Sequence, residues 1–321
     1  MQLATAAVTV GEEKLPMVIQ FEEGSDIDAF TSWYTENRSF VDEELLKVGA
    51  LFIKGIHSDT VEKFDSLGKF LCPNAPNFLD GNSPRGKHTS NVYNASEYDA
   101  NAIIRLHTEY SYSNIWPSRL YFCCITPAAT GGQTTVGDCR LMLDKLNPAL
   151  VDEFERKGIT YIRNLHSGQG FGPSWQDAFE TKDKKTMEAY CATNGIKVEW
   201  QRNGDVRLTQ TRPAIRKHPI TGDRLWFNQV DQFYPRIYGD EVYETLLMMA
   251  GGDEKALPMH STYGDGSPIQ KEYVEEIVRV LDEVLIPVPW EAGDLLIVEN
   301  MVSLHGRLPF TGPRKIVVCM A

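Results

Sequence analysis

The feature that most constrains the fold is a series of short apolar stretches separated by turn residues. The C-terminal part shows it most clearly, with IPVPW at 286–290, GDLLIV at 293–298 and KIVVCM at 315–320. The stretches 119–126 and 159–163 are of the same kind. Short strands bounded by Gly, Pro, Asn and Asp are typical of β-sandwiches and barrels. The sequence therefore predicts a mainly β protein with flanking helices.

A few longer segments have apolar residues at helical spacing. We expect helices at 26–48, at 140–157 with an internal break at Pro148, at 184–193 and at 270–285. No repeat, charge block or low-complexity linker divides the chain, so we predict a single domain over 1–321. The segment 72–96 is rich in Pro, Asn, Gly and Ser and too long for an ordinary connection, which suggests an active-site lid.

Composition excludes some classes of partner. The chain has 44 acidic and 32 basic residues and a formal net charge of −12, which argues against nucleic acid. It contains no long apolar run of the kind that spans a membrane. The six cysteines form no CxxC pair, and the N-terminus lacks a basic start followed by an apolar stretch. We therefore expect reduced thiols and a cytoplasmic protein.

The clearest candidate for a metal site is His107 with Glu109, in the segment RLHTEYSY. On an extended strand, residues i and i+2 point to one face, so the imidazole and the carboxylate could reach one metal ion. Taken alone, the pair would also fit an exposed polar strand. His305 follows a buried strand 198 residues later and would supply a third ligand. Two histidines and one carboxylate make the facial triad of non-haem Fe(II) oxygenases.

Arg314 lies nine residues after His305, at the start of another apolar stretch. Its guanidinium offers a planar fork that can hold a carboxylate through two hydrogen bonds. Such a group would suit the far end of a dicarboxylic cosubstrate whose near end chelates the iron.

With these residues in place, the sequence resembles the taurine/2,4-D dioxygenase (TauD/TfdA) superfamily of Fe(II)- and 2-oxoglutarate-dependent oxygenases. Within it, the chain is similar to the clavaminate-synthase-like group that includes the syringomycin-pathway aspartate hydroxylase. The resemblance runs from about residue 40 to the C-terminus. Its motifs are HTEYSY at 107–112, WP at 116–117, PAATGGQT at 127–134, YIRN at 161–164, HPITG at 218–222, WFNQ at 226–229, YGDGS at 263–267, GDLL at 293–296, NM at 300–301, HGR at 305–307 and PFTGPR at 309–314.

The resemblance implies a double-stranded β-helix (jelly-roll) core. It also implies that His107, Glu109 and His305 bind Fe(II), and that Arg314 and Thr134 hold the distal carboxylate of 2-oxoglutarate. Gln133 stands where the wider superfamily often has Asp, and Thr135 follows directly, so which threonine contacts the cosubstrate stays open. The halogenating relatives lack the carboxylate ligand, and Glu109 therefore argues against halogenation.

The substrate side is less defined by sequence. Candidate contacts are Arg163, Asn164, Asn228, Gln229 and Arg307. The first two could equally cap the end of a strand, and Arg307 could equally be structural.

The resemblance implies an enzyme that oxidises an unactivated C–H bond with Fe(II), 2-oxoglutarate and O2. Hydroxylation is expected first, with desaturation or cyclisation as other outcomes. The substrate would be a small amino-acid-derived molecule of specialised-metabolite biosynthesis, free or held on a carrier protein. Two alternatives are a zinc metallohydrolase that uses the same triad and a catalytically inactive binding homologue. The first would leave Arg314 and Thr134 without a purpose, and the second would tolerate changes in the triad.

Overall fold

The structure of the chain is a computed structural model. It describes residues 8–12, 14–22, 24–73, 78–81, 89, 92–95, 98–170 and 172–321.

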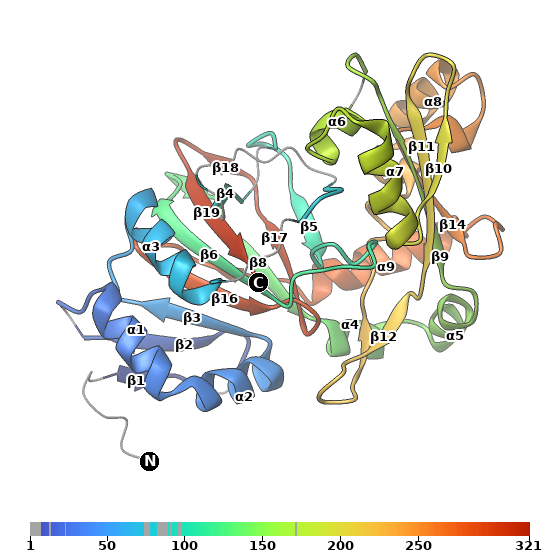
Figure 1. The fold of residues 1–321 in the computed structure, drawn as a ribbon. Coiled ribbons are helices and arrows are strands. Elements are labelled where there is room, and N and C mark those ends of the chain that lie inside the picture. The colour runs from blue at the N-terminus through green and yellow to red at the C-terminus, as the bar shows by residue number, and fades with distance from the viewer. Residues whose placement is uncertain are drawn as a thin grey trace.

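The largest element is a seven-stranded sheet that mixes distant parts of the sequence (Figure 1). Its strand order is β1-β2-β3-β16-β6-β19-β4. All neighbours are antiparallel except β2 and β3, which run parallel. The strands are β1 (Val8–Val10), β2 (Met17–Phe21), β3 (Ala50–Lys54), β16 (Leu295–Glu299), β6 (Arg119–Thr126), β19 (Lys315–Met320) and β4 (Tyr93–Asn94).

A second sheet, with the order β15-β8-β17-β5, packs against one face of the first. The facing side chains form a shared core in which Val136 and Val288 of the small sheet meet Phe122 and Val318 of the large one. These two sheets make the jelly-roll core, as expected from the resemblance. The strands are β15 (Ile286–Val288), β8 (Thr134–Asp138), β17 (Ser303–Arg307) and β5 (Ile104–His107), with the short pair β7 (Thr130–Gly131) and β18 (Phe310–Thr311) beside them.

Three helices cover the outer face of the large sheet (Figure 1). They are α1 (Ile27–Glu36), α2 (Arg38–Val48) and α3 (Val61–Leu71). The period of two along β6 explains the two layers, because Tyr121 and Cys123 pack under the helices while Leu120 and Phe122 face the other sheet. The prediction of one helix over 26–48 was wrong, because the helix is interrupted at Asn37. The backbone of Asn37 is not helical, and its side chain donates a hydrogen bond to Trp33 O at the end of α1.

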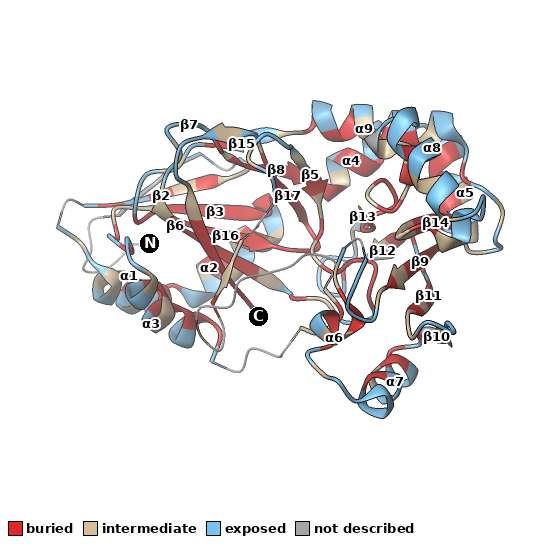
Figure 2. Ribbon diagram, turned by 90° about the horizontal axis from the view of Figure 1, so that it is seen from above, coloured by how far each residue is buried: buried red, intermediate tan, exposed pale blue. Residues whose placement is uncertain are grey.

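A third sheet stands at the other end of the molecule, with the order β10-β11-β9-β14 (Figure 1). One face packs with α4, α5 and α9 into a core that also includes Leu106 of β5 and Tyr112 of the turn after it. The other face packs on α6 and α7. Figure 2 shows buried residues along the strands and exposed outer faces on the helices. The elements are β9 (Ile159–Leu165), β10 (Lys197–Trp200), β11 (Val206–Arg212), β12 (Ile215–Lys217), β13 (Arg224–Trp226), β14 (Met259–Tyr263), α4 (Cys139–Lys145), α5 (Pro148–Lys157), α6 (Trp175–Ala178), α7 (Lys184–Thr193), α8 (Asp240–Met249), α9 (Lys271–Glu283), and the 3-10 turns η1 (Pro235–Tyr238) and η2 (Glu254–Ala256).

Several sequence predictions agree with these elements. The strand 119–126 and the helix 184–193 have the predicted bounds, and Pro148 starts α5 after a break that follows α4. In the described part of the chain, no helix is both long and apolar enough to cross a bilayer. The single domain over 1–321 stays a prediction.

Candidate functional site

The two candidate histidines lie side by side on neighbouring strands. β17 pairs with β5 so that His305 faces His107, and the centroids of their rings are 4.4 Å apart. The antiparallel pairing therefore closes a distance of 198 residues in sequence. A break in the register follows directly, between His305 and Arg307.

Glu109 does not lie on a strand, which corrects the sequence prediction. β5 ends at His107, and the chain turns at Glu109–Tyr112. Asn300 stabilises this turn: its Oδ1 accepts from Glu109 N at 2.7 Å, and its Nδ2 donates to Glu109 O at 2.9 Å and to Pro117 O at 2.8 Å. Tyr110 has a φ of 57°, an unusual value for a bulky residue, within this turn. Hydrogen bonds to the buried side chain of Asn300, and not pairing within a strand, therefore hold the backbone of Glu109.

Three potential ligand atoms converge despite the turn. Glu109 Oε2 lies 3.7 Å from His107 Nε2 and 3.4 Å from His305 Nε2. One ligand atom from each residue lies within 4.8 Å of the other two. Metal–ligand bonds of about 2.1 Å place neighbouring ligand atoms about 3 Å apart, close to these separations. The donor set and its spacing therefore fit a divalent transition metal.

The orientation of the His107 ring is set by the backbone. Nδ1 lies 2.9 Å from the carbonyl oxygen of Arg105. Because a carbonyl oxygen only accepts, Nδ1 carries the proton and Nε2 keeps its lone pair toward Glu109. Such an outer hydrogen bond is the usual way in which proteins fix a metal-binding imidazole.

Arg314 brings a half-buried positive charge close to Thr134. Its Nε donates to Gly132 O at 2.8 Å, and its Nη2 lies 3.5 Å from Thr134 Oγ1. Burial, with the neighbouring Arg307 as a smaller cause, lowers the pKa of Arg314 to about 10. No acidic residue in the described part of the chain forms an ion pair with it. A Cβ on Gly132 would lie 3.1 Å from Arg314 Cδ, so this glycine, at φ +71°, leaves room for the arginine.

The alternation of β8 separates the two candidate threonines. Thr134 lines the same cavity as Arg314, and its Oγ1 accepts a hydrogen bond from Trp290 Nε1 at 2.9 Å. Its own proton therefore remains available for an acceptor in the cavity. Thr135 is fully buried and is not part of the cavity wall. The geometry favours Thr134 as the residue that can meet a carboxylate.

A cavity of about 390 Å³, called here the central cavity, connects these groups. It is a mixed apolar and charged space between the jelly roll and the third sheet. Its wall includes His107, Glu109, His305, Arg314, Thr134, Arg105, Arg307, Gln229, Asp231, Gln232, Phe122, Tyr112, Ile237, Met259 and Met320.

The candidate substrate residues fall into two groups. Gln229 and Arg307 line the central cavity, whereas Arg163, Asn164 and Asn228 do not. The Asn228 side chain bonds to Ala214 O and Val230 N, and the Asn164 side chain bonds to Leu257 O and Arg207 Nε. Arg307 donates to the carbonyl oxygens of residues 98, 99 and 102 and so holds the adjoining loop. Direct substrate contact by these residues stays a prediction.

Arg163 is part of a buried ion pair. Its guanidinium bonds to the carboxylate and carbonyl of Asp80, and both side chains are almost completely buried. Tyr112 Oη donates to the same Asp80 carbonyl, and Tyr110 Oη donates to Phe78 O. The short segment 78–81 is therefore attached to β9 and to the turn that carries Glu109.

Most of the expected lid, 72–96, lies outside the described residues. Its described parts are 72–73, 78–81, 89 and 92–95. Of these, Ala95 lines the central cavity, directly after β4. A lid function for the segment stays a prediction.

Sequence reasoning missed Asp231, which lines the central cavity and is 3% exposed. Burial raises the pKa of its carboxyl to about 6. It lies in a turn after β13, where aspartate is common for purely local reasons. No signal in the sequence distinguishes it from an ordinary turn residue, because only the fold brings this turn next to His107 and Glu109.

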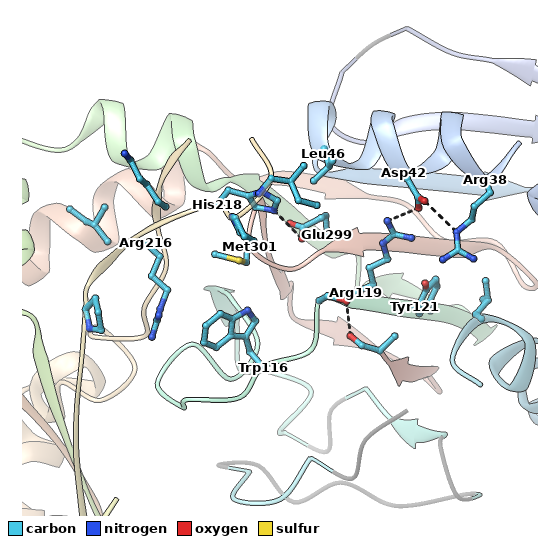
Figure 3. Close-up of a pocket in the computed structure, with 18 residues that line it drawn as sticks. Arg38, Asp42, Leu46, Trp116, Arg119, Tyr121, Arg216, His218, Glu299 and Met301 are labelled. Carbon is cyan, nitrogen blue, oxygen red and sulfur yellow. Dashed lines mark hydrogen bonds and ion pairs between the residues drawn. The ribbon is translucent and has the colours of Figure 1, made fainter. Parts of the chain in front are cut away.

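A second and larger space, the outer cleft, has a volume of about 820 Å³ (Figure 3). It lies between α2, the start of β6, β12 with the turn at 218–220, and the end of β16. Asp42 pairs with Arg119 at 2.6 Å and with Arg38 at 3.4 Å, and His218 Nε2 lies 3.6 Å from Glu299 Oε1. Most of its charged groups are thus paired with one another.

Fold and site together define a class of protein: a jelly roll in which two neighbouring strands bring two histidines to one cavity wall and the turn after one of these strands adds a carboxylate. A sequence profile of the taurine catabolism dioxygenase TauD, TfdA family matches residues 12–320. The chain belongs to this family. It is a non-haem dioxygenase that depends on Fe(II), 2-oxoglutarate and O2.

Among curated proteins, the chain is similar to the dapdiamide synthesis protein DdaC of Enterobacter agglomerans. The two are 33% identical over 310 residues, which cover 97% of this chain and 92% of the relative. A clavaminate synthase-like protein of Arabidopsis thaliana is 26% identical over 300 residues, covering 91% and 87% of the two chains.

Among solved structures, the chain resembles the PvcB protein of Pseudomonas aeruginosa. The TM-score is 0.54 at 14% identity, covering 99% of this chain and 91% of that one. A taurine dioxygenase from Burkholderia xenovorans gives a TM-score of 0.54 at 14% identity, covering 98% and 89%. These similarities establish the jelly-roll fold. A zinc hydrolase or an inactive homologue is not favoured by the family match.

Proposed function

We propose that His107, Glu109 and His305 hold Fe(II) in this enzyme, and that Arg314 and Thr134 bind the distal carboxylate of 2-oxoglutarate. The observation that carries the proposal is the convergence of the three ligand atoms on a cavity that also contains Arg314. A half-buried guanidinium without an acidic partner among the described residues is stabilised when a ligand supplies the anion.

With iron and 2-oxoglutarate bound, the site couples decarboxylation of the cosubstrate to oxidation of a substrate C–H bond by dioxygen. The chain positions the reacting groups and shields them from water. Asn300 fixes the backbone of Glu109, and Arg105 O fixes the ring of His107. Phe122, whose ring centroid lies 5.3 Å from that of His305, adds an apolar wall.

The substrate is proposed to be a small amino-acid-derived molecule of a specialised-metabolite pathway, with hydroxylation as the first expected outcome. The similarity to a protein named for dapdiamide synthesis supports this choice. A cavity of about 390 Å³ is of a size suited to such a molecule. Presentation of the substrate on a carrier protein is the finer proposal, and succinate release with free and carrier-loaded forms of one substrate would test it.

A cytoplasmic location completes the proposal. All six cysteines are free and buried, which is usual where thiols are kept reduced.

The test is an anaerobic titration with Fe(II) and 2-oxoglutarate, followed by the visible metal-to-ligand charge-transfer band. Wild-type protein should develop the band, His107→Ala should not, and Arg314→Ala should need a much higher 2-oxoglutarate concentration. Arg216→Ala, which removes an arginine of the outer cleft, is the matched control and should behave like wild type. Iron binding without the band in wild-type protein would overturn the proposal.

A further inference from the structure

Asp231 stands apart from the other buried acids. Asp80, Asp231, Asp294 and Glu299 are the buried acidic residues in the described part of the chain. Three of them face a cationic or imidazole partner: Asp80 pairs with Arg163, Asp294 with Lys54 at 3.0 Å, and Glu299 with His218. Asp231 forms no such ion pair among the described residues. Its Oδ2, like Asp80 Oδ2, has no hydrogen-bond partner there, and the other interactions of its carboxyl are with the backbone N–H groups of Asp231 and Gln232.

Its surroundings make this unusual. A carboxylate removed from water without a partner costs several kcal/mol, so proteins rarely retain one without a reason. Asp231 lines the central cavity together with His107 and Glu109, the site where substrate must come closest to the iron. A carboxyl oxygen that is buried in a ligand cavity and has no partner in the protein, as Asp231 Oδ2 has none among the described residues, is commonly satisfied by the ligand.

The cations of the cavity wall are engaged elsewhere. Arg105 pairs with Asp282 of α9 at 3.1 Å, and Arg307 donates to three backbone carbonyls. Arg314 is directed at Gly132 and Thr134. None of these arginines forms an ion pair with Asp231 in the described structure, although the charge of Arg105 acts on its carboxyl from a distance. A positive charge on the ligand would be the first to pair with it directly.

We propose that Asp231 binds a protonated amine of the substrate, so that the substrate class is an ammonium-bearing small molecule. Gln229 and Gln232 of the same turn line the cavity beside it and offer amide oxygens as further acceptors. This inference rests on the proposed function, because it places the amine in the cavity that holds iron and 2-oxoglutarate.

The experiment compares two probes of equal size, 4-aminobutanamide and 4-hydroxybutanamide, which differ in one ammonium against one hydroxyl group. Each is titrated anaerobically into the Fe(II)- and 2-oxoglutarate-loaded protein. The broadening of the probe's proton NMR lines by bound paramagnetic iron gives its dissociation constant. Wild-type protein should bind the ammonium probe at least about 10-fold more tightly than the hydroxyl probe.

Asp231→Asn should lose this preference while its affinity for the hydroxyl probe changes little. Asp42→Asn, which removes an acid of the outer cleft and leaves the wall of the central cavity unchanged, is the matched control and should keep the preference. The charge-transfer band of each variant reports that its iron site is intact.

Two results would overturn the inference alone: wild-type protein with a normal band and no preference for ammonium, or Asp231→Asn with the wild-type preference. The first comparison needs no variant, so a folding defect cannot obscure it. Absence of the band in wild-type protein would instead overturn the proposed function, and this inference with it.

Discussion

The central cavity and the outer cleft differ in how their charges are used. The outer cleft has about twice the volume, about 820 Å³ against about 390 Å³. Its acids are nevertheless satisfied within the protein, since Asp42 faces two arginines and Glu299 faces His218 (Figure 3). Arg216 is the exception, and it lies over the ring of Trp116 at 4.5 Å.

In the central cavity, by contrast, two of the charged groups have no ion-pair partner within the described part of the protein. Three ligand atoms crowd together, and Arg314 and Asp231 lack ion-pair partners among the described residues. Paired charges stabilise a fold, whereas buried charges without partners mark the place where a ligand completes the structure. The comparison teaches that volume alone would have selected the cleft whose charges are mostly paired, and not the cavity that holds the three potential metal ligands.

The largest effect should come from the metal ligands. His107→Ala removes one of the three proposed iron ligands, so turnover should fall on the order of 10⁴-fold, as when a catalytic group is removed. Succinate release under air and iron content after dialysis measure this loss. Lys217→Ala in the outer cleft is the control and should retain full turnover. A variant at His107 with substantial iron and turnover would contradict the assignment.

Replacing Arg163, whose charge is paired with Asp80, should lower the stability of the fold. Arg163→Met leaves Asp80 buried without its partner, and the free energy of unfolding should fall by about 3–5 kcal/mol. Urea denaturation measures it. The more exposed ion pair of Arg105 with Asp282 provides the control. Arg105→Met should lower the free energy of unfolding by less than about 1 kcal/mol. If Arg163→Met were as stable as wild type but failed to bind substrate, Arg163 would belong with the ligand-binding charges.

Arg314→Ala tests a charge that has no acidic partner among the described residues. The dissociation constant of 2-oxoglutarate should rise by about 30-fold to 1000-fold, since the bound carboxylate would lose its buried partner. The free energy of unfolding of the ligand-free protein should stay level or increase, because a half-buried charge without an acidic partner among the described residues is removed. Calorimetric titration and thermal unfolding measure the two quantities. A clear loss of stability with unchanged cosubstrate affinity would make Arg314 structural.

Asn300→Ala should produce a smaller effect that links the two regions. Asn300 bonds to Glu109 on one side and to Pro117, next to the outer cleft, on the other. Its loss should lower stability by about 1–3 kcal/mol and weaken iron binding by about 10-fold to 100-fold. Asn300→Asp, which keeps the acceptor for Glu109 N, should weaken iron less than Asn300→Ala. Equal iron affinity in all three proteins would disprove the support of Glu109 by Asn300.

Local pattern was enough for elements whose burial is uniform. The strand 119–126 could be predicted because a run of apolar residues packs on both faces. The segment 26–48 could not be divided correctly, because apolar spacing continues across Asn37 while a buried side-chain hydrogen bond breaks the helix there. The prediction that His107 to Glu109 is extended was wrong for a similar reason, because the turn at Glu109 is stabilised by Asn300, 191 residues away.

The sequence by itself determined the chemistry available to this protein: a mainly β chain with two histidines, a glutamate and an arginine in the order typical of the family. Residue types and local periodicity carry that information because they depend on neighbours in the chain. The tertiary structure alone decided which groups meet. Strand register brings His305 beside His107, and the alternation of side chains along β8 places Thr134, not Thr135, in the cavity wall. Arg163 pairs with Asp80 and does not line the cavity. Long-range packing sets these relations, and no local pattern encodes the partner of a buried charge.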